Sequence, residues 1–432
     1  MMRTIAWFTN DLRLHDNESW TNAASQGNEV IPLYCFDDSH FEGTSFGFKK
    51  TGTFRWRFLL ESITALNEQL NLLGSQLIIV KGKPEIEIIN IVQKYKIDKV
   101  FAMEQTGFEE KRTQQKVKLA LSTTNCVFES SETKTLFKAS GLPFSIQQLP
   151  TGFTEFRKLV EAKSFVWPIA KAPEEIQPLK VDETFELPEF SDSNAINFNT
   201  DSRSVLPFKG GENEALKRLH YYLWESHAID TYKLTRNEMI GERYSTKFSP
   251  WLSMGCLSPR FIYHEIKKYE KQFTSNESTY WVIFELLWRE FFSWMMIKYP
   301  YQYFIANGIH KTKIHSANND PLLLQRWIDG KTDSDFINAN MIELKLTGFM
   351  SNRGRQNAAS YCCHDLKLDW RCGAAYFEQQ LIDYDVSSNW CNWAYIAGVG
   401  NNPRGKSVFN IEKQANEYDN NKSYRTLWLN KQ

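Results

Sequence analysis

The sequence predicts two parts of different fold class: an α/β N-terminal domain with a doubly wound, five-stranded parallel sheet, and an all-α C-terminal domain. Over the first 130 residues, strand-like apolar runs alternate with helical patterns, which is typical of a parallel sheet covered by helices. Those runs are apolar throughout, as expected when helices cover both faces of a sheet. From Gly210 onward the strand signals disappear. We therefore predict an α/β domain at 1–135, a connector at 136–209 and a helical domain at 210–432.

The individual elements follow from the same two periodicities. The strands are predicted at Thr4–Thr9, Val30–Phe36, Gln76–Val80, Lys99–Met103 and Cys126–Glu129. The helices between them are predicted at Glu18–Ser25, Phe54–Leu73, Glu85–Tyr95 and Glu109–Leu121. Seven of the 14 prolines fall within residues 143–207, so that segment is predicted to be mostly extended, with one helix at Phe153–Ala162.

Composition excludes several classes of protein. With 51 Lys+Arg and 51 Asp+Glu, the chain does not bind nucleic acid through bulk charge alone. The net charge is nevertheless uneven, −4 over residues 1–208 and +4 over 209–432. No apolar run approaches the roughly 20 residues of a membrane span, and the first residues lack a signal-peptide pattern. Seven cysteines without metal-ligand spacing lead us to expect a reduced, cytoplasmic protein with no metal site.

One predicted helix, residues 280–297, is apolar on nearly every face and therefore belongs at the centre of a domain. It carries Glu285 and Arg289, four residues apart on one face, with Trp288 beside them. Buried charges are costly unless they are paired or used. The two interpretations are a structural Glu–Arg pair and a polar binding site with an aromatic floor.

Two further segments carry charges among apolar residues. Arg353 and Arg355 flank Gly354, and on a helix their spacing lets one face an internal anion and the other face solvent. Asp383 and Asp385 could act as a general acid–base pair, bind a metal, or accept from a ring N–H and a ribose hydroxyl. They could also simply cap a helix. A metal is disfavoured because neither a histidine nor a third carboxylate stands at ligand spacing.

The segment before a helix expected at Leu252–Tyr269 has the composition of a phosphate seat. Ser249 suits the N-cap and Pro250 the first helical position. Capping does not explain the preceding Ser245-Thr246-Lys247, whereas an anion at a helix N-terminus would. No glycine-rich phosphate loop follows the first strand, so the α/β domain lacks the dinucleotide-binding fingerprint.

Several long motifs in a fixed order resemble one known family. Residues 7–17, Trp-Phe-Thr-Asn-Asp-Leu-Arg-Leu-His-Asp-Asn, are similar to the opening of the photolyase/cryptochrome family. The segments Ser245–Gly255, Glu285–Phe291, Ser351–Asn357 and Leu381–Gly400 resemble its flavin-binding segments. Ser-Asn-Arg-Gly-Arg-Gln-Asn and Asn-Trp-Cys-Asn-Trp-Ala-Tyr are most similar to the cryptochrome DASH branch. The resemblance implies an antenna chromophore in the N-terminal domain and FAD in the helical domain.

Carried over position by position, the resemblance implies two cofactor sites. The FAD phosphates would be held by Tyr232, Ser245, Thr246, Lys247, Phe248 and Ser249. The flavin and its chain would be held by Arg289, Asn352, Arg355, Asp383 and Asp385, with Asn389 facing N5. Glu109 and Glu110 resemble the acidic pair that binds methenyltetrahydrofolate, although adjacent glutamates at a helix start also complement the helix dipole.

The resemblance also implies a DNA-lesion pocket and a chain of electron donors. The pocket would be formed by Glu285, Trp288, Asn352, Gln356 and Tyr395, with Arg353, Arg404 and Lys406 as phosphate contacts at its rim. Trp393, Trp370 and Trp327 match the family's electron-transfer chain, which runs from the flavin outward to solvent.

The implied activity is light-driven splitting of cyclobutane pyrimidine dimers by an electron from excited, reduced FAD. Photolyases of duplex DNA commonly carry Met and Trp where Gln356 and Tyr395 stand here. Because extruding two bases from a duplex is costly, a weaker clamp favours single-stranded DNA. We expect a monomer. The alternative is a flavin blue-light photoreceptor that signals without repair, although the long tail usual in signalling cryptochromes is missing after Trp428. A duplex-specific photolyase is disfavoured by the same two residues, and residues 350–353 lack the histidine pair of (6-4) photolyases.

Overall fold

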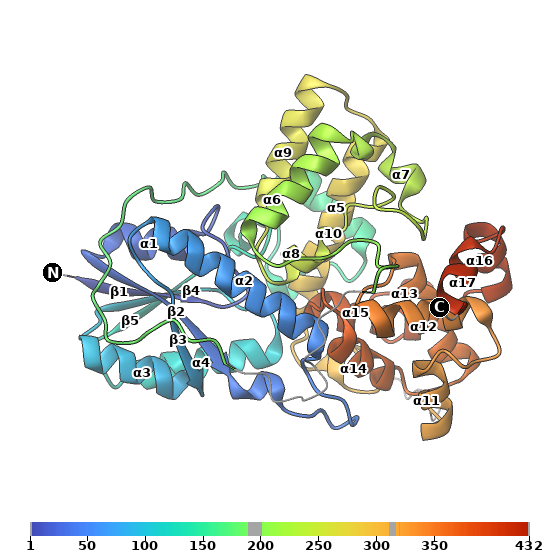
Figure 1. Ribbon diagram of the computed structural model, residues 1–432, viewed down its shortest axis with the longest axis horizontal. Helices are drawn as coiled ribbons and strands as arrows, with labels where there is room; N and C mark the ends of the chain where they lie inside the picture. The colour runs from blue at the N-terminus through green and yellow to red at the C-terminus, as the bar shows by residue number, and fades with distance from the viewer. Residues whose placement is uncertain (1, 189–200, 311–316, 319, 431–432) are drawn as a thin grey trace.

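The computed structural model describes residues 2–188, 201–310, 317–318 and 320–430. A twisted sheet with its helices forms the N-terminal end of the molecule, and helices alone form the remainder (Figure 1). Both halves of the predicted fold class are therefore confirmed. Among the described residues, no helix is long and apolar enough to cross a membrane.

The sheet has five parallel strands in the order β3-β2-β1-β4-β5. The order reverses on either side of β1, which makes the sheet doubly wound. Every predicted strand is present, and its ends agree with the prediction to within two residues. The strands are β1 (Arg3–Phe8), β2 (Glu29–Asp37), β3 (Ile78–Gly82), β4 (Lys99–Met103) and β5 (Val127–Ser131).

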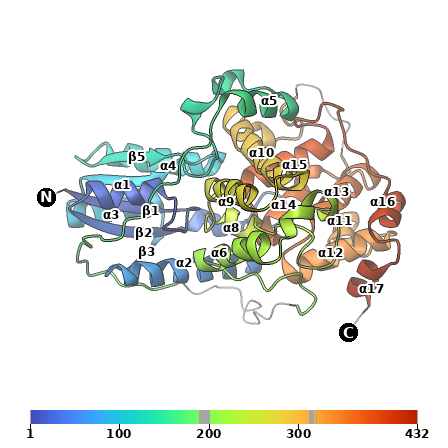
Figure 2. The same cartoon turned by 90° about the horizontal axis from the view of Figure 1, so that it is seen from above.

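Helices cover both faces of the sheet because successive side chains of a strand point to opposite faces. In β1, Ile5 and Trp7 belong to a core shared with α3 and α4, whereas Ala6 and Phe8 belong to the core shared with α1 and α2. Figure 2 shows these helices around the sheet. They are α1 (Glu18–Gln26), α2 (Thr53–Leu72), α3 (Pro84–Tyr95) and α4 (Phe108–Leu121).

The connector contains the predicted helix as α5 (Phe153–Lys163) and then returns along the sheet. Its extended part makes a parallel bridge between Pro178 and Val30, and Glu183 binds Lys94 at 2.6 Å. Part of the connector, residues 189–200, lies outside the described residues. The connector therefore packs on the α/β domain as well as leading away from it.

The helical domain places one long apolar helix, α10, at its centre, in contact with α5, α7, α9 and α15. Two single π-turns interrupt the helical chain, at Tyr221–Glu225 and Tyr361–Asp365. The helices are α6 (Glu212–His220), α7 (Tyr232–Thr235), α8 (Ser249–Ser253), α9 (Pro259–Gln272), α10 (Glu277–Lys298), α11 (Pro321–Ile328), α12 (Asp335–Thr347), α13 (Asn352–Ser360), α14 (Trp370–Gln380), α15 (Val386–Ala397), α16 (Ile411–Tyr418) and α17 (Ser423–Leu429).

The single helix predicted at Leu252–Tyr269 is wrong, because the chain forms two helices there, α8 and α9. Gly255 separates them with a φ of +67°, in the left-handed region that favours glycine. A Cβ at Gly255 would lie 2.0 Å from the backbone oxygen of Asn10. The break therefore lets the first loop of the α/β domain lie directly against the helical domain.

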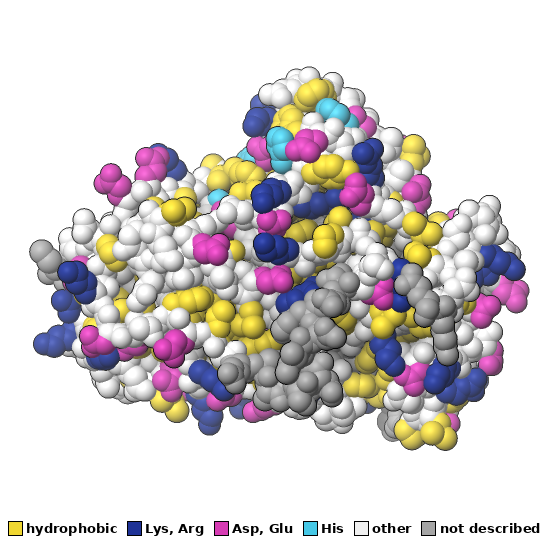
Figure 3. Space-filling view, viewed as in Figure 1, with side chains coloured by type: hydrophobic (Ala, Val, Ile, Leu, Met, Phe, Trp, Pro, Cys, Tyr) yellow, Lys and Arg dark blue, Asp and Glu magenta, His cyan; other side chains and the backbone are white. Residues whose placement is uncertain are grey.

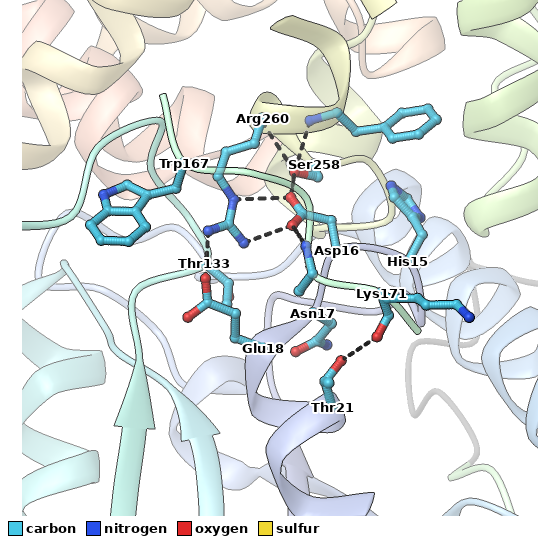
Figure 4. A network of polar contacts seen from close by, with 12 residues as sticks. His15, Asp16, Asn17, Glu18, Thr21, Thr133, Trp167, Lys171, Ser258 and Arg260 are labelled. Carbon is cyan, nitrogen blue, oxygen red and sulfur yellow. Dashed lines mark hydrogen bonds and ion pairs between the residues drawn. The ribbon is translucent and has the colours of Figure 1, made fainter. Parts of the chain in front are cut away.

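A buried ion-pair network joins the two domains at this point (Figure 4). Arg260 donates to both carboxylate oxygens of Asp16, at 2.8 and 3.0 Å, and binds Glu18 at 2.6 Å. Ser258 also donates to Asp16, and the backbone N–H of Ala170 does so at 2.9 Å. Arg260 and Asp16 are 1% and 0% exposed, and every oxygen of Asp16 has a partner. The network is therefore a structural junction.

Candidate functional site

A cavity of about 540 Å³ opens in the helical domain between α10, α13 and α15. Asp383 and Asp385 enter it from the segment that precedes α15. The structure brings together twelve of the predicted site residues in its lining: Ser249, Glu285, Trp288, Arg289, Asn352, Arg355, Gln356, Asp383, Asp385, Asn389, Trp393 and Tyr395.

Asp383 is the most informative polar group in this cavity. One carboxylate oxygen accepts from Arg355 at 2.8 Å and from Ser249 at 2.6 Å. The other oxygen is buried and has no hydrogen-bond partner. Because unpaired buried polar atoms are costly, an oxygen left so in a cavity fits a ligand that donates a hydrogen bond. A flavin ring N–H is such a donor.

Asp385 has a different role, although it lies only two residues away. It caps α15 by accepting from the backbone of Ser388 at 2.8 Å, and it pairs with Lys134 at 2.7 Å. Burial alone would raise the pKa of Asp385, but the charges of Lys134 and Arg289 outweigh burial and hold the pKa below its usual range. Asp385 is thus the helix cap that was one of the predicted alternatives, and it is also the anion of a buried pair with Lys134.

Asn389 stands on α15 one turn after Asp385 and also lines the cavity. Its side-chain nitrogen donates to the backbone oxygen of Ala374 at 3.0 Å. That bond fixes the amide and leaves its carbonyl oxygen as an acceptor for a donor in the cavity.

The interpretation of Glu285 and Arg289 as a structural pair is wrong. Glu285 pairs instead with Arg236, and Arg289 donates to the backbone oxygen of Lys134 at 2.7 Å. Enclosure by the cavity walls raises the pKa of Glu285 even with Arg236 beside it, although 33% of its side chain is exposed. The carboxyl group is therefore placed to bind a ligand at the cavity mouth.

Aromatic rings form the wall next to Glu285. Trp288 stacks on Phe153 with centroids 3.7 Å apart, and Tyr395 meets Trp288 edge-on at 6.0 Å. Gln356 and Asn352 line the same cavity from α13. This combination offers stacking and hydrogen bonding to a flat heteroaromatic ligand.

The predicted phosphate seat differs from expectation. Ser249 is not the N-cap, since α8 begins at it and its hydroxyl donates to Asp383. Lys247 places its ammonium over the ring of Tyr244, 3.4 Å from the centroid, and donates to the backbone oxygen of Glu242 at 3.1 Å. Burial, together with the charge of Arg218, lowers the pKa of Lys247 to about 6.

The remaining residues predicted for FAD lie outside the cavity lining. Tyr232 and Phe248 are buried, whereas Ser245 and Thr246 are half-buried. Arg218 donates to the backbone oxygens of Ser245 and Thr246, at 3.2 and 3.0 Å, and so fixes this loop.

The two predicted rim arginines also differ from each other. Arg353 is not a free surface charge, because it donates to Asn237 at 3.0 Å and lies over the ring of Tyr418. Arg404 is exposed on the loop that follows α15. On the face shown in Figure 3, positive and negative side chains are interspersed, in keeping with the zero net charge.

The predicted tryptophan chain does not reach solvent through Trp327. That residue is 0% exposed, and its indole N–H has no hydrogen-bond partner. Its ring lies 6.1 Å from that of Trp393, whereas the ring of Trp370 lies against Trp390 at 5.9 Å. The order Trp393, Trp370, Trp327 outward is therefore wrong for its last member, because Trp327 packs in the core beside the first.

A second cavity, of about 550 Å³, lies between the domains. Glu109 and Glu110 line it, and Glu109 pairs with Lys50 at 2.7 Å. Aromatic rings from both domains form part of its other walls, together with charged side chains such as Arg55, Arg371 and Glu378. Tyr384 lines both cavities. The acidic pair predicted to hold an antenna thus faces a cavity of suitable chemistry.

Several residues that shape these cavities were missed by sequence reasoning. Arg236 and Lys134 pair with predicted residues 49 and 251 positions away. Such partners carry no local signal because only the tertiary fold brings them together. The same holds for Glu378 and Trp390, which line the second cavity. Among the described residues, no group of three or more His, Cys, Asp or Glu could hold a metal ion.

Comparisons with known proteins agree with this geometry. Residues 4–177 match the DNA photolyase family model, and residues 281–431 match the FAD-binding domain of DNA photolyase. The chain is 46% identical to the cryptochrome DASH of Danio rerio, over 98% of this chain and 82% of that protein. It is 44% identical to that of Synechocystis sp., over 98% of this chain and 87% of that protein.

A solved structure gives the same result. The crystal structure of the Synechocystis sp. PCC6803 cryptochrome superposes with a TM-score of 0.94 at 42% identity, covering 99% of this chain and 88% of that one. The helical domain is thus an FAD-binding domain, and its cavity, with the unpaired oxygen of Asp383, fits that cofactor. The chain belongs to the photolyase/cryptochrome family and is most similar to its cryptochrome DASH branch.

Proposed function

We propose that the protein repairs cyclobutane pyrimidine dimers in DNA, preferentially single-stranded DNA, in a light-driven reaction. One observation carries the proposal: one half of the cavity carries residues suited to bind the flavin, and the other half, beside it, carries residues suited to bind nucleobases. Asp383, Asp385 and Asn389 form the first half, and Glu285, Trp288 and Tyr395 form the second. A flipped pyrimidine pair bound by the second half would therefore meet the cofactor directly.

When bound, reduced FAD would supply on excitation the electron that opens the cyclobutane ring and would take it back once the ring has split, so that the overall reaction is redox-neutral. The protein's own residues bind and orient. Asp383 accepts a ring N–H through its unpaired oxygen, and Arg355 and Ser249 fix that carboxylate. Asn389 provides a carbonyl acceptor beside it. Glu285 would hydrogen-bond the pyrimidine pair from the cavity mouth; burial raises the pKa of its carboxyl group, which shifts it toward the protonated form that can donate to a pyrimidine carbonyl.

The preference for single strands follows from the clamp on the bases. Tyr395 and Gln356 present a smaller ring and a polar amide where a stronger apolar clamp would hold extruded bases. Flipping two bases out of a duplex costs a few kcal/mol, and contacts with Tyr395 and Gln356 offset less of that cost than a stronger apolar clamp would. Arg404 then contacts phosphate at the rim.

The second cavity is the proposed antenna site, with methenyltetrahydrofolate as its ligand. The support is the aromatic rings in its walls together with Glu109 and Glu110. A monomeric protein in the cytoplasm completes the proposal. The seven cysteines, all of them free thiols, fit a reducing compartment.

The test is illumination of the purified, chemically reduced protein with dimer-containing oligonucleotides, single-stranded and duplex. Recovery of thymine absorbance should be faster on the single strand. Glu285→Gln keeps a hydrogen-bond donor, whereas Glu285→Leu removes it, so repair should fall more in the second variant. No recovery on either substrate would contradict the proposal and favour a photoreceptor that signals without repair.

A further inference from the structure

Four tryptophans of the helical domain form two ring pairs, and one of them, Trp393, lines the FAD cavity. Trp393 pairs with Trp327 at 6.1 Å, and Trp370 pairs with Trp390 at 5.9 Å. The six-membered ring of Trp393 lies against Gly373, where an added Cβ would be only 2.3 Å away. Gly373 follows Trp370 by about one turn of α14, so this helix joins the two pairs.

None of the four rings is exposed. Their exposed fractions are 3% for Trp393, 0% for Trp327, 5% for Trp370 and 4% for Trp390. When Trp393 is oxidised, the electron vacancy (the positive hole) therefore cannot migrate to a solvent-exposed member of this group. It must end where the protein itself removes the positive charge, because a buried, unpaired charge is costly.

One-electron oxidation makes an indole N–H far more acidic than that of a neutral indole, so the proton can pass to a carboxylate within hydrogen-bond distance. The four indoles differ in this respect. Trp327 has no partner for its N–H, and Trp370 donates to the backbone oxygen of Ala306 at 3.1 Å, which is not a base. Trp390 donates to the carboxylate of Glu378 at 3.0 Å and to the hydroxyl of Tyr384 at 3.3 Å.

We propose that Trp390 is the terminal electron donor of the tryptophan chain and that Glu378 accepts its proton. One electron passes from the Trp390 indole to the oxidised Trp370, which is restored. The N–H bond of Trp390 breaks, and the proton forms an O–H bond on Glu378. A neutral indolyl radical and a neutral carboxylic acid remain, and neither carries a buried charge. This inference rests on the FAD of the proposed function, taken in its oxidised form: photoexcited oxidised flavin would be the oxidant that takes the first electron from Trp393, whereas repair uses the reduced form.

The surroundings of Glu378 set a pH dependence. Burial raises the pKa of Glu378 to about 7, and the charge of Glu110 adds to this increase. The charge of Arg55 and the hydrogen bonds from Trp390 and Tyr384 act in the opposite direction. Lys50 faces the same carboxylate from the loop before α2. Only the ionised carboxylate can take a proton. Proton transfer from Trp390 should therefore become more efficient as pH rises through about 7.

The experiment is flash photolysis of the FAD-loaded protein, recording tryptophan radical cation and neutral radical separately. In the parent, the yield of long-lived neutral radical should rise with pH. Trp390→Phe should abolish that species. Glu378→Gln keeps the hydrogen bond but not the base, so the vacancy should remain a cation and recombine about tenfold faster, with no pH dependence. The matched control is Trp294→Phe, whose indole donates to Glu290 at 2.7 Å in the core of α10.

A second measurement needs no flavin. Emission of Trp390, taken as the parent minus Trp390→Phe, should titrate with a midpoint near pH 7 in flavin-free protein and should lose that titration in Glu378→Gln. If Glu378 were only a structural carboxylate, Glu378→Gln would leave the radical seen by flash photolysis in the same protonation state as in the parent.

Two results would overturn the inference: an unchanged neutral-radical yield in Trp390→Phe, or loss of that yield in Trp327→Phe with Trp390 intact. Repair by chemically reduced protein does not need the tryptophan chain. Failure of that repair in the parent therefore overturns the proposed function, whereas intact repair with an unchanged Trp390→Phe signal overturns only the inference.

Discussion

Two buried Asp–Arg pairs in this molecule look alike and differ in one oxygen atom. At the domain junction, both oxygens of Asp16 are paired, with Arg260, Ser258 and the backbone of Ala170 (Figure 4). In the cavity, Asp383 is held by Arg355 through one oxygen, and its other oxygen has no partner. The difference indicates that a buried carboxylate with both oxygens paired has a structural role, whereas one with an unpaired oxygen has an acceptor available for a ligand.

The largest expected effect comes from breaking the junction. Arg260→Met leaves Asp16 buried without its cation, which should lower the free energy of unfolding by about 3–5 kcal/mol. Urea unfolding followed by circular dichroism measures this loss. The control is Arg3→Met, which removes an ion pair with Glu29 that is over 30% exposed on the arginine side and should cost at most about 1 kcal/mol. Equal losses in the two variants would contradict the assignment of the junction.

The next effect tests the other half of the comparison. Asp383→Asn keeps the shape of the side chain but replaces the charged acceptor, so FAD affinity should fall by about 1.5–3 kcal/mol, or roughly 10- to 150-fold. Flavin fluorescence during titration of flavin-free protein gives the dissociation constant. Asp419→Asn breaks a comparable pair with Arg425 near the C-terminus and should leave FAD affinity unchanged. A drop in stability with unchanged FAD affinity would show that Asp383, like Asp16, is a structural carboxylate and not a cofactor ligand.

A third buried carboxyl group, Glu343, forms no ion pair with any residue that the structure describes, and so adds a buried acid without a cation to the comparison. It accepts from Tyr424 at 2.5 Å, and burial raises its pKa to about 8 even though Tyr424, Arg355 and Lys247 act to lower it. The folded state therefore holds a proton that the unfolded state releases near its ordinary pKa. The stability from this group is complete below that value and is lost as pH rises to about 8.

Glu343→Gln keeps an acceptor for Tyr424 and removes the titration. Its unfolding free energy should exceed that of the parent by about 1–2 kcal/mol at alkaline pH, and the advantage should shrink toward pH 5. Urea midpoints at the two pH values decide this. An advantage that grew in acid would show that the carboxylate is ionised in the folded protein.

The smallest expected effect concerns a glycine beside the cavity. Gly373→Ala places a methyl group 2.3 Å from the Trp393 ring, so the ring must shift. Overpacking costs about 1–3 kcal/mol, and the better helix propensity of alanine returns about 1 kcal/mol. Thermal unfolding should change little, while the near-UV circular dichroism of Trp393 should change clearly. Gly152→Ala, with open space around it, is the control for both measurements.

The sequence predicted the elements well because their signals are local. Strand Lys99–Met103 and helix Glu109–Leu121 are periodic patterns within a few residues, and the structure places them within one residue of expectation. The prediction failed at Leu252–Tyr269 because it continued the helix through Gly255 and through Ser258-Pro259, which are a break and a new helix start in the structure.

The residues of the site likewise divide into those with a local sequence signal and those brought in only by the tertiary fold. Asp383, Asp385 and Asn389 were found because they stand together in one motif. Their long-range partners were not: Lys134 comes from the end of the α/β domain, and Arg236 from a loop 49 residues before Glu285. The position of Trp327 was misjudged for a related reason, since burial is a property of the assembled domain.

Three consecutive residues contribute to the lining of the two cavities. Asp383 and Asp385 line the FAD cavity, and Tyr384 between them in the sequence lines both cavities. The residue that follows the flavin acceptor Asp383 is therefore also a wall of the proposed antenna site. A substitution of Tyr384 would alter the surroundings of both chromophores at once, so its effects could not be assigned to one cavity alone.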